Sequence, residues 1–243
     1  SAFGDQMRIC ENAAKKNLMP DTHYQIPLST FYDEIEEREA SRSNDGRGSR
    51  ASSLKDGRRA YQKKPGGRIR KWMGDLSMQT CSPRDALEHY QVSIEVSRSL
   101  GDDMWLAGAL EGYAAAILLA IKLEEPLAEI LRGDLKALGE GFGGPHTTMV
   151  VKALMIAEER AAEAIQLYSK SVVFCGLEGE CSLRVAKMQE MIGIDKTGKH
   201  PWYGREQRAV AYILHATSVP GLNVQQQVEC MIEGALVCKR LNL

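Results

Sequence analysis

The sequence lacks the patterns that usually mark an enzyme or a metal site. Its six cysteines form no C-x-x-C pair and its five histidines complete no zinc-ligand spacing, so we expect reduced thiols in a cytosolic protein. No G-x-S-x-G or H-E-x-x-H motif occurs. The glycine-rich stretch 139–146 lacks the Lys-Ser/Thr pair that follows in a phosphate-binding loop. We therefore expect no catalytic residue, metal, cofactor or small-molecule substrate.

A strong net charge and a leader sequence are also missing. The formal net charge is −1, so no global field attracts the chain to nucleic acid. No aromatic platform or groove-reading motif supports nucleic-acid binding either. The chain begins Ser-Ala-Phe-Gly, without an initiator methionine and without a basic segment followed by an apolar one. We expect a piece of a longer protein without a secretory signal.

The longest apolar run, Trp105 to Ala120, is too short for a membrane span. Gly108 and Gly112 match G-x-x-x-G, a packing pattern of membrane helices. However, Glu111 interrupts the run, and a span needs about 20 apolar residues. We predict a packed helix in water, with Glu111 facing solvent or a partner.

Composition divides the chain into three predicted parts. Residues 1–41 are mixed and their fold is unclear. Residues 42–69 are rich in Ser, Gly and Arg and contain few aliphatic side chains. Burial of so few apolar groups cannot offset the conformational entropy lost on folding, so we predict a basic flexible linker. Residues 70–243 show helical periodicity and no strand-like alternation, which predicts a helical region.

Cap residues locate several of these helices. Ser82 and Pro83 predict a helix start and Gly101 a stop, with Leu87, Tyr90 and Ile94 on the apolar face. The opposite face carries Arg84, Glu88, Gln91, Glu95 and Arg98. Further helices are expected from 102 or 103 onward, over 126–139, as two helices meeting near 158–160, and around 182–192, 205–216 and 224–241. The last has one apolar stripe formed by Val224, Val228, Met231, Ala235 and Cys238.

Small residues recur at the period of a tetratricopeptide repeat. Gly74 and Gly108 are 34 residues apart, as are Ala86 and Ala120, and Tyr90 follows Ala86 on the same helix face. A second Ala-Tyr step at 164 and 168 is out of phase, and Glu124 stands where the second aromatic is expected. We predict an all-α fold of antiparallel helix pairs stacked as a tetratricopeptide-like α-solenoid, with an irregular helical bundle as the alternative. The residues expected to pack the repeats are Gly74, Ala86, Tyr90, Gly108, Ala120, Ala164 and Tyr168.

A cluster of cations spans 55–71, with Tyr61 and Trp72 among them. It is compatible with a solvated linker, an acidic partner, or an anionic membrane, at which each cation contributes about 1 kcal/mol. Nonspecific nucleic-acid binding is less consistent with the rest of the chain. The candidate residues for contact with an anionic surface are Arg58, Arg59, Lys63, Lys64, Arg68, Arg70 and Lys71.

Residues 57–112 resemble a known family. The similarity is carried by Gly74-Asp75-Leu76, by Asp85-Ala86-Leu87 with His89-Tyr90, and by "DDMWLAGALEG" over 102–112. These residues are similar to the helical region of the subunit 9 family of the trafficking protein particle complex TRAPP II, a large subunit specific to that complex. A looser similarity runs from Tyr168 to Gln189.

The resemblance implies a non-enzymatic scaffold in a Golgi and endosomal tethering complex. Its implied partners are other TRAPP subunits and, through the complex, a Rab GTPase of the Rab11 or Rab1 class whose nucleotide exchange the complex promotes. The implied location is the cytoplasm, peripherally on Golgi membranes. The alternative is a tetratricopeptide adaptor of another pathway that binds a peptide or helix. Gly74, Ser77, Gly108 and Glu111, on the first helices of the repeats, are small or acidic and disfavour a carboxylate clamp.

Overall fold

The computed structural model describes residues 66–138, 148–191 and 205–242, and all regular secondary structure in these ranges is helical. An all-α fold is thus confirmed for this part of the chain. A helix covers 66–79. The longer helices that follow are α4 (Pro83–Leu100), α5 (Asp103–Lys122), α8 (Met149–Tyr168), α9 (Cys175–Met188), α10 (Arg205–Ser218) and α11 (Val224–Leu241). The short ones are α6 (Leu127–Ile130), α7 (Arg132–Leu138) and the 3-10 turns η2 (Val172–Phe174) and η3 (Gln189–Met191).

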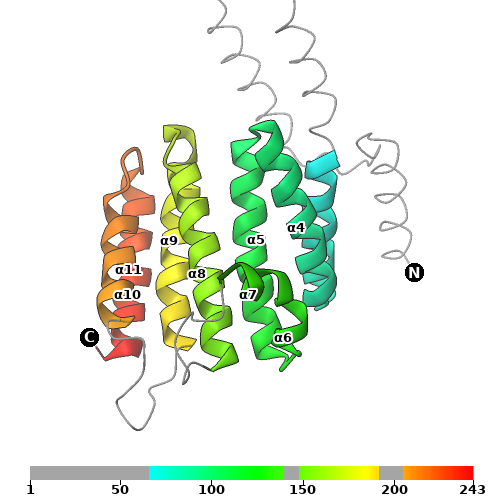
Figure 1. The fold of residues 1–243 in the computed structure, drawn as a ribbon. Coiled ribbons are helices and arrows are strands. Elements are labelled where there is room, and N and C mark those ends of the chain that lie inside the picture. Colours follow the sequence, from blue (N-terminus) through cyan, green and yellow to red (C-terminus); the bar gives the residue numbers. More distant parts are fainter. Residues whose placement is uncertain (1–65, 139–147, 192–204, 243) are drawn as a thin grey trace, which may run out of the picture.

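The long helices stand side by side and follow one another across the molecule in chain order (Figure 1). α5 packs against α4 and α8, α9 packs against α8 and α10, and α11 packs against α9 and α10. The short α6 and α7 interrupt this order, because they lie across one side of α5 and α8. Each long helix therefore buries its apolar side mainly against its neighbours in the row.

Local signals set the turn between α4 and α5. Pro83 occupies the first turn of α4, and Gly101 ends the helix with φ of 64°, a left-handed conformation that glycine adopts without steric cost. Asp102 is then the N-cap of α5. These bounds confirm the predicted start and stop, and such a tight turn makes α4 and α5 antiparallel. The predicted apolar face of α4 is buried, including Leu87, Tyr90 and Ile94.

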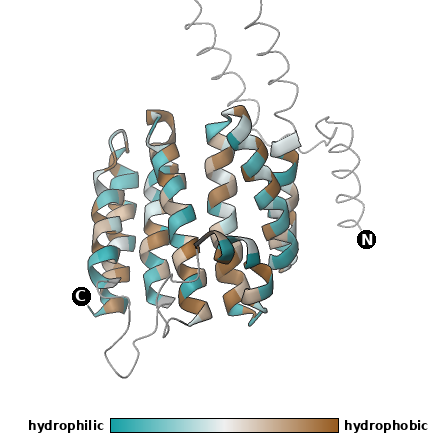
Figure 2. Ribbon diagram, in the orientation of Figure 1, coloured by the Kyte–Doolittle hydropathy of each residue, from teal (hydrophilic) through white to brown (hydrophobic). Residues whose placement is uncertain are grey.

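α5 is the central helix of the larger core. By length and composition it could cross a membrane, but half of its most apolar window is buried inside the protein. Alanines 107, 109, 116 and 120 are fully buried, and their small side chains let neighbouring helices approach closely. Figure 2 shows few hydrophilic turns along α5, whereas α4 and α8 alternate between hydrophilic and hydrophobic. α5 is thus apolar on most sides because α4 and α8 cover it.

Three predicted helix assignments were wrong. The helix expected around 182–192 is α9, which already begins at Cys175 and ends at Met188. α8 is one helix over Met149–Tyr168, not two that meet near 158–160. The run Glu158-Glu159-Arg160 indicated an exposed break, but Glu158 is buried and bonds to Arg208 of α10. Near Leu131 the predicted 126–139 helix is instead divided into α6 and α7.

The predicted boundary between linker and helical region also needs revision. Residues 66–69 already belong to a helix, and Arg68 and Ile69 are buried. The helical region therefore begins at least four residues earlier than composition indicated. The predicted N-terminal segment 1–41 and the linker residues 42–65 lie outside the described residues, so their assignment stays a prediction.

Candidate interaction groove and the contacts between helices

Tyr90 of α4 fills the space between two other helices. A Cβ at Gly74 would lie 2.6 Å from the ring atom Cε1 of Tyr90, and one at Gly112 of α5 would lie 2.5 Å from Cζ. The Tyr90 hydroxyl donates to Oδ1 of Asp75 at 2.8 Å. Burial, together with Asp75, raises the pKa of Tyr90 above its usual range. Two glycines and one carboxylate thus hold this ring between the 66–79 helix, α4 and α5.

Tyr168 of α8 occupies a related position one pair of helices further on. Its hydroxyl donates to Oε2 of Glu111 on α5 at 3.1 Å and lies near Gly108. Glu111 also pairs with Arg184 of α9. The prediction that Glu111 faces solvent or a partner is wrong, because its carboxylate links α5 to both α8 and α9.

Gly108 is packed less tightly than its 34-residue spacing from Gly74 suggests. A Cβ at Gly108 would meet only the Cε atom of Lys71 at 3.5 Å and the Tyr168 hydroxyl at 3.9 Å, which are ordinary contact distances. The close approach in α5 is instead at Gly112. The other predicted packing residues, Ala86, Ala120 and Ala164, are all fully buried.

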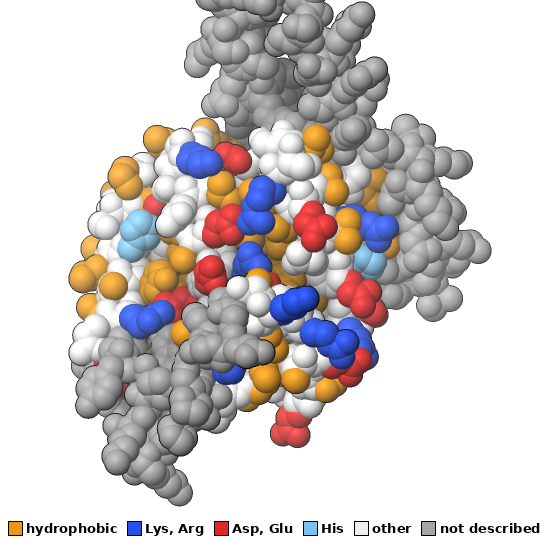
Figure 3. All heavy atoms as spheres, viewed as in Figure 1, with side chains coloured by type: hydrophobic (Ala, Val, Ile, Leu, Met, Phe, Trp, Pro, Cys, Tyr) orange, Lys and Arg blue, Asp and Glu red, His pale blue; other side chains and the backbone are white. Residues whose placement is uncertain are grey.

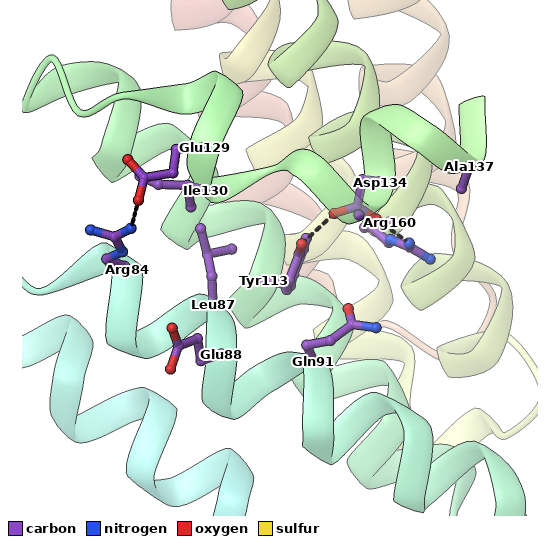
Figure 4. Close-up of a pocket in the computed structure, with 11 residues that line it drawn as sticks. Arg84, Leu87, Glu88, Gln91, Tyr113, Glu129, Ile130, Asp134, Ala137 and Arg160 are labelled. Carbon is purple, nitrogen blue, oxygen red and sulfur yellow. Dashed lines mark hydrogen bonds and ion pairs between the residues drawn. The ribbon is translucent and has the colours of Figure 1, made fainter. Parts of the chain in front are cut away.

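A groove of about 470 Å³ lies on the side of α4, α5 and α8 that α6 and α7 border (Figure 4). The predicted polar face of α4 forms one wall through Arg84, Glu88 and Gln91. Ile130 and Ala137 line the opposite wall. The groove therefore offers charged, amide and apolar groups together, which suits the side chains of a protein partner.

Two ion pairs fasten α6 and α7 beside this groove. Glu129 pairs with Arg84 of α4, and both side chains are exposed. Asp134 accepts a bond of 2.7 Å from Nη2 of Arg160 on α8 and another from the hydroxyl of Tyr113 on α5. The Arg160 guanidinium also lies 5.9 Å from the centre of the Tyr113 ring.

The Asp134 cluster is partly shielded from water at the edge of the groove. Burial, followed by the nearby Asp134 carboxylate, raises the pKa of Tyr113 above its usual range. Burial on its own would lower the pKa of Arg160, but the bond and the charge of Asp134 outweigh it and raise that pKa. Tyr113 therefore stays protonated and Arg160 charged, and together they hold α7 against α5 and α8.

A second polar cluster joins α8 to α10. Oε1 of Glu158 accepts bonds from Arg208 Nε at 3.0 Å and from the Tyr212 hydroxyl at 3.3 Å. Burial, with the Glu158 charge next in effect, raises the pKa of Tyr212 to about 12. Nearby, Nε2 of His215 lies 2.9 Å from the buried carboxylate of Glu178 on α9. Glu158 and Glu178 are buried at helix interfaces, where these contacts offset the cost of removing their carboxylates from water.

The structure changes the list of cations predicted to contact an anionic surface. Arg68 is buried, bonds to Asp102 through Nε at 3.0 Å, and lies 5.2 Å from the centre of the Trp105 ring. The prediction that Arg68 contacts an anionic surface is wrong, because its side chain is buried and its charge is paired with Asp102 inside the protein. Lys71 pairs with Asp75 at 2.7 Å, and Arg70 contacts His89. Arg58, Arg59, Lys63 and Lys64 lie outside the described residues.

The face viewed in Figure 3 carries acidic and basic side chains in alternation and no large region of one sign. Several of these charges pair between helices, such as Arg98 of α4 with Glu163 of α8 at 2.6 Å. Within the described ranges, no group of three or more His, Cys, Asp or Glu residues is arranged to hold a metal ion. The chemistry of this face therefore favours contacts with proteins of mixed charge.

Sequence reasoning found one wall of the groove and missed the other. The polar face of α4 followed from helical periodicity, and Arg84, Glu88 and Gln91 do line the groove. Asp134 and Arg160 had no such signal, because they are 26 residues apart and meet only through packing. Residues at this separation on different helices leave no spacing pattern in the sequence.

Comparison with known proteins then gives the family. A family model described as "Trs120/TRAPPC9, N-terminal domain" matches residues 4–125, half of the chain. The chain belongs to the Trs120/TRAPPC9 family. The range that matches includes the 66–79 helix, α4 and α5, and it ends before α8 begins. The Tyr90 packing site therefore lies wholly inside the Trs120/TRAPPC9 match. No solved structure matches the chain.

Curated proteins of this family are similar over a shorter stretch. Trafficking protein particle complex subunit 9 of Mus musculus is 46% identical over 61 residues, and that of Homo sapiens is 44% identical over 61. Each match covers 25% of this chain and 5% of the relative. The trafficking protein particle complex II-specific subunit 120 homolog of Arabidopsis thaliana is 47% identical over 53 residues, covering 22% of this chain and 4% of that protein. The matches thus span only a small part of these relatives' length.

Proposed function

We propose that this chain is part of a non-enzymatic scaffold subunit of a TRAPP II-type vesicle-tethering complex. The observation that carries the proposal is the match of half the chain to the Trs120/TRAPPC9 family. Its relatives are named as subunits of the trafficking protein particle complex in animals and in plants. The described surface, with paired charges and a mixed groove, supports a role in protein contacts.

The scaffold that we propose is a tetratricopeptide-like α-solenoid. Tyr90 and Tyr168 support it, because each lies near a glycine of the long helix before its own and donates to a carboxylate on that long helix. Gly74 and Tyr90 are 16 residues apart, whereas Gly108 and Tyr168 are 60 apart, since α6 and α7 lie between α5 and α8. An insertion inside the second helix pair thus accounts for the Ala-Tyr step that is out of phase with the 34-residue period. Stacked helix pairs of this kind present extended surfaces to partners.

The partners in this proposal are other TRAPP subunits, with a Rab GTPase of the Rab11 or Rab1 class engaged through the complex. Golgi and endosomal membrane traffic is the process, and peripheral attachment to the cytoplasmic side of Golgi membranes is the location. No residue of this chain is assigned a part in nucleotide exchange. We place the subunit contact in the groove of α4, α5 and α8, which Gln91 lines.

Co-purification from cells tests both the function and its site. We expect the tagged chain to recover TRAPP subunits, identified by mass spectrometry. Gln91→Arg places a cation in the groove and should reduce this recovery at least several-fold. Gln166→Arg, the same change on the exposed surface of α8, should not.

The outcomes separate the two parts of the proposal. If the unmodified chain recovers no TRAPP subunit, the function is wrong. If it does, and both variants recover as much, the function stands and the groove is not the contact site. Folding of each variant is checked by circular dichroism, since the argument needs an intact helical structure.

A membrane contact of the basic segment is tested by flotation with anionic vesicles. Replacing Arg58, Arg59, Lys63 and Lys64 by Ala should reduce flotation, because each cation contributes about 1 kcal/mol near such a surface. The matched control replaces Arg132 and Lys136, exposed cations of α7, by Ala. Equal flotation of the variant and the unmodified chain would remove the membrane contact from the proposal.

A further inference from the structure

The charges that line the groove of α4, α5 and α8 do not balance. Three of its lining residues are acidic, namely Glu88, Glu129 and Asp134, and two are basic, namely Arg84 and Arg160. Each basic side chain already has an acidic partner on another helix, since Arg84 pairs with Glu129 and Arg160 pairs with Asp134. The carboxylate of Glu88 is therefore left over when the charges of the groove are matched.

Glu88 is exposed on α4, and no ion pair engages it within the described ranges. Arg84 precedes it by one turn of the same helix, but the Arg84 guanidinium bonds to Glu129 of α6. The interactions marked in Figure 4 reach Arg84 and Asp134, and none of them reaches Glu88. The negative charge of Glu88 is thus available to a group that enters the groove from outside.

Apolar side chains share the groove with this carboxylate. Leu87, Ile130 and Ala137 contribute to its lining. The volume of about 470 Å³ lies within the range of about 300–1,000 Å³ that is typical of ligand-binding pockets, so the groove can take side chains as well as water. Lysine and arginine carry their charge at the end of an aliphatic stem, which can lie on apolar surface while the charged end meets a carboxylate.

We infer that the TRAPP subunit which enters this groove presents a lysine or arginine to Glu88, beside an apolar side chain that packs on Leu87 and Ile130. The inference rests on the proposed function, because it names the chemistry of the partner at the proposed contact site.

The cost of covering Glu88 is what selects a cationic partner. A neutral or acidic segment would take this carboxylate out of water without a partner, and a buried unpaired charge is strongly unfavourable. The cations of the groove cannot take over this role, because Arg84 and Arg160 already bond to Glu129 and Asp134. A lysine or arginine on the incoming segment supplies the missing charge and also excludes acidic competitors, since charge complementarity at an interface mainly sets specificity.

Charge changes of opposite sign in the groove test the inference. Glu88→Gln should lower the recovery of TRAPP subunits by the tagged chain several-fold. Gln91→Glu adds a carboxylate to the same wall and should raise recovery at least twofold, opposite to the decrease expected for Gln91→Arg. Gln166→Glu, on the exposed surface of α8 outside the groove, is the matched control and should change nothing. Circular dichroism shows whether each variant remains folded.

Salt dependence separates a charge effect from a structural one. Charges act over about 10 Å at about 0.1 M salt and over only about 3 Å at about 1 M. Between these concentrations, recovery by the unmodified chain should fall more steeply than recovery by Glu88→Gln. Equal slopes would show that Glu88 acts through the shape of α4 and would overturn the inference.

Photo-cross-linking from the rim of the groove identifies the segment that enters it. Ala137 is exposed and lines the groove, so benzoylphenylalanine at this position should cross-link to a TRAPP subunit. Mass spectrometry should find a lysine or arginine next to an apolar residue in the cross-linked peptide. A peptide without a cation overturns the inference, and so does a cross-link between two copies of this chain or the absence of any cross-link.

The outcomes distinguish this inference from the proposed function. If the unmodified chain recovers no TRAPP subunit, the proposed function is wrong and the inference falls with it. If TRAPP subunits are recovered equally by the unmodified chain, by Glu88→Gln and by Gln91→Glu, the function stands and the inference is overturned. Lower recovery with Glu88→Gln and higher recovery with Gln91→Glu, at unchanged helical content, support both.

Discussion

The ring of Tyr90 lies so close to Gly74 that a methyl group on Gly74 would come within 2.6 Å of ring atom Cε1. A Cβ at Gly112 of α5 would come within 2.5 Å of atom Cζ of the same ring. The same ring is therefore in close contact with both glycines, and its hydroxyl is held by Asp75. The packing of the first three described helices therefore depends on the absence of two side chains.

Gly74→Ala and Gly112→Ala should both destabilise the chain. Overpacking of this kind costs about 1–3 kcal/mol, and the better helix propensity of alanine recovers only about 0.5–1 kcal/mol. Gly108→Ala is the control, because a Cβ at Gly108 meets only ordinary contacts and should leave stability unchanged or raise it. Urea denaturation measures all three. Equal losses at all three positions would contradict the steric explanation.

Asp102→Ala should be among the most damaging changes at a helix start. Its carboxylate bonds to the buried Arg68, and removing one partner of a buried ion pair costs about 3–5 kcal/mol. Asp102 makes no side-chain cap bond, so loss of capping does not confuse the measurement. Asp103→Ala next to it removes an exposed pair with Lys170 and should cost at most about 1 kcal/mol. Similar unfolding free energies for the two variants would disprove the buried pair's role.

Stability should fall as the pH rises from about 10 to 12. The pKa of Tyr212 is raised from 10.0 to about 12 by burial and by Glu158, so the folded chain retains this proton where the unfolded chain loses it. Unfolding then releases a proton, and higher pH favours the unfolded state. Tyr212→Phe removes this contribution, so its stability should decline less steeply over the same range. Denaturation at several pH values measures both slopes, and parallel declines would refute the assignment.

The described cysteines should differ sharply in reactivity. Cys81 is exposed, whereas Cys181 is buried, and burial raises the pKa of its thiol to about 12. Because the thiolate is the reactive form, alkylation of the native chain should label Cys81 rapidly and Cys181 only after unfolding. Mass spectrometry of timed samples reads out each site, with denatured protein as the control. Labelling of Cys181 at the rate of Cys81 in native protein would show that the α8–α9 interface opens readily.

Local signals predicted the ends of individual helices well. Pro83, Gly101 and the 224–241 range were located from caps and periodicity, since these depend on residues within one or two turns. The same reasoning was wrong at Glu158, because a charged residue in mid-helix looks like an exposed break unless its partner Arg208 is known. It was also wrong for Arg68, whose partner Asp102 is 34 residues away. Such errors arise where a charged side chain is buried against an opposite charge that lies far away in the sequence.

The same distinction applies to the candidate groove, of which the sequence predicted one wall and missed the other. The polar face of α4 was visible as a 3.6-residue period, and this wall is formed by a single helix. The wall of α6 and α7 depends on Asp134, Arg160 and Tyr113, which come from three helices. These three residues come into contact only because their helices pack together, and no spacing pattern in the sequence indicates the contact.

For the described part of this protein the sequence alone determined the all-helical class and several helix bounds, and it also showed the resemblance to one family, because propensity, capping and local identity are read residue by residue. The tertiary structure decided which glycines are essential, which charges are buried, and which face of α11 is left exposed. Gly108 and Gly112 look alike in the sequence, yet only Gly112 touches the Tyr90 ring. The reason is physical: steric fit and desolvation depend on neighbours in space, and those neighbours are known only once the helices have packed.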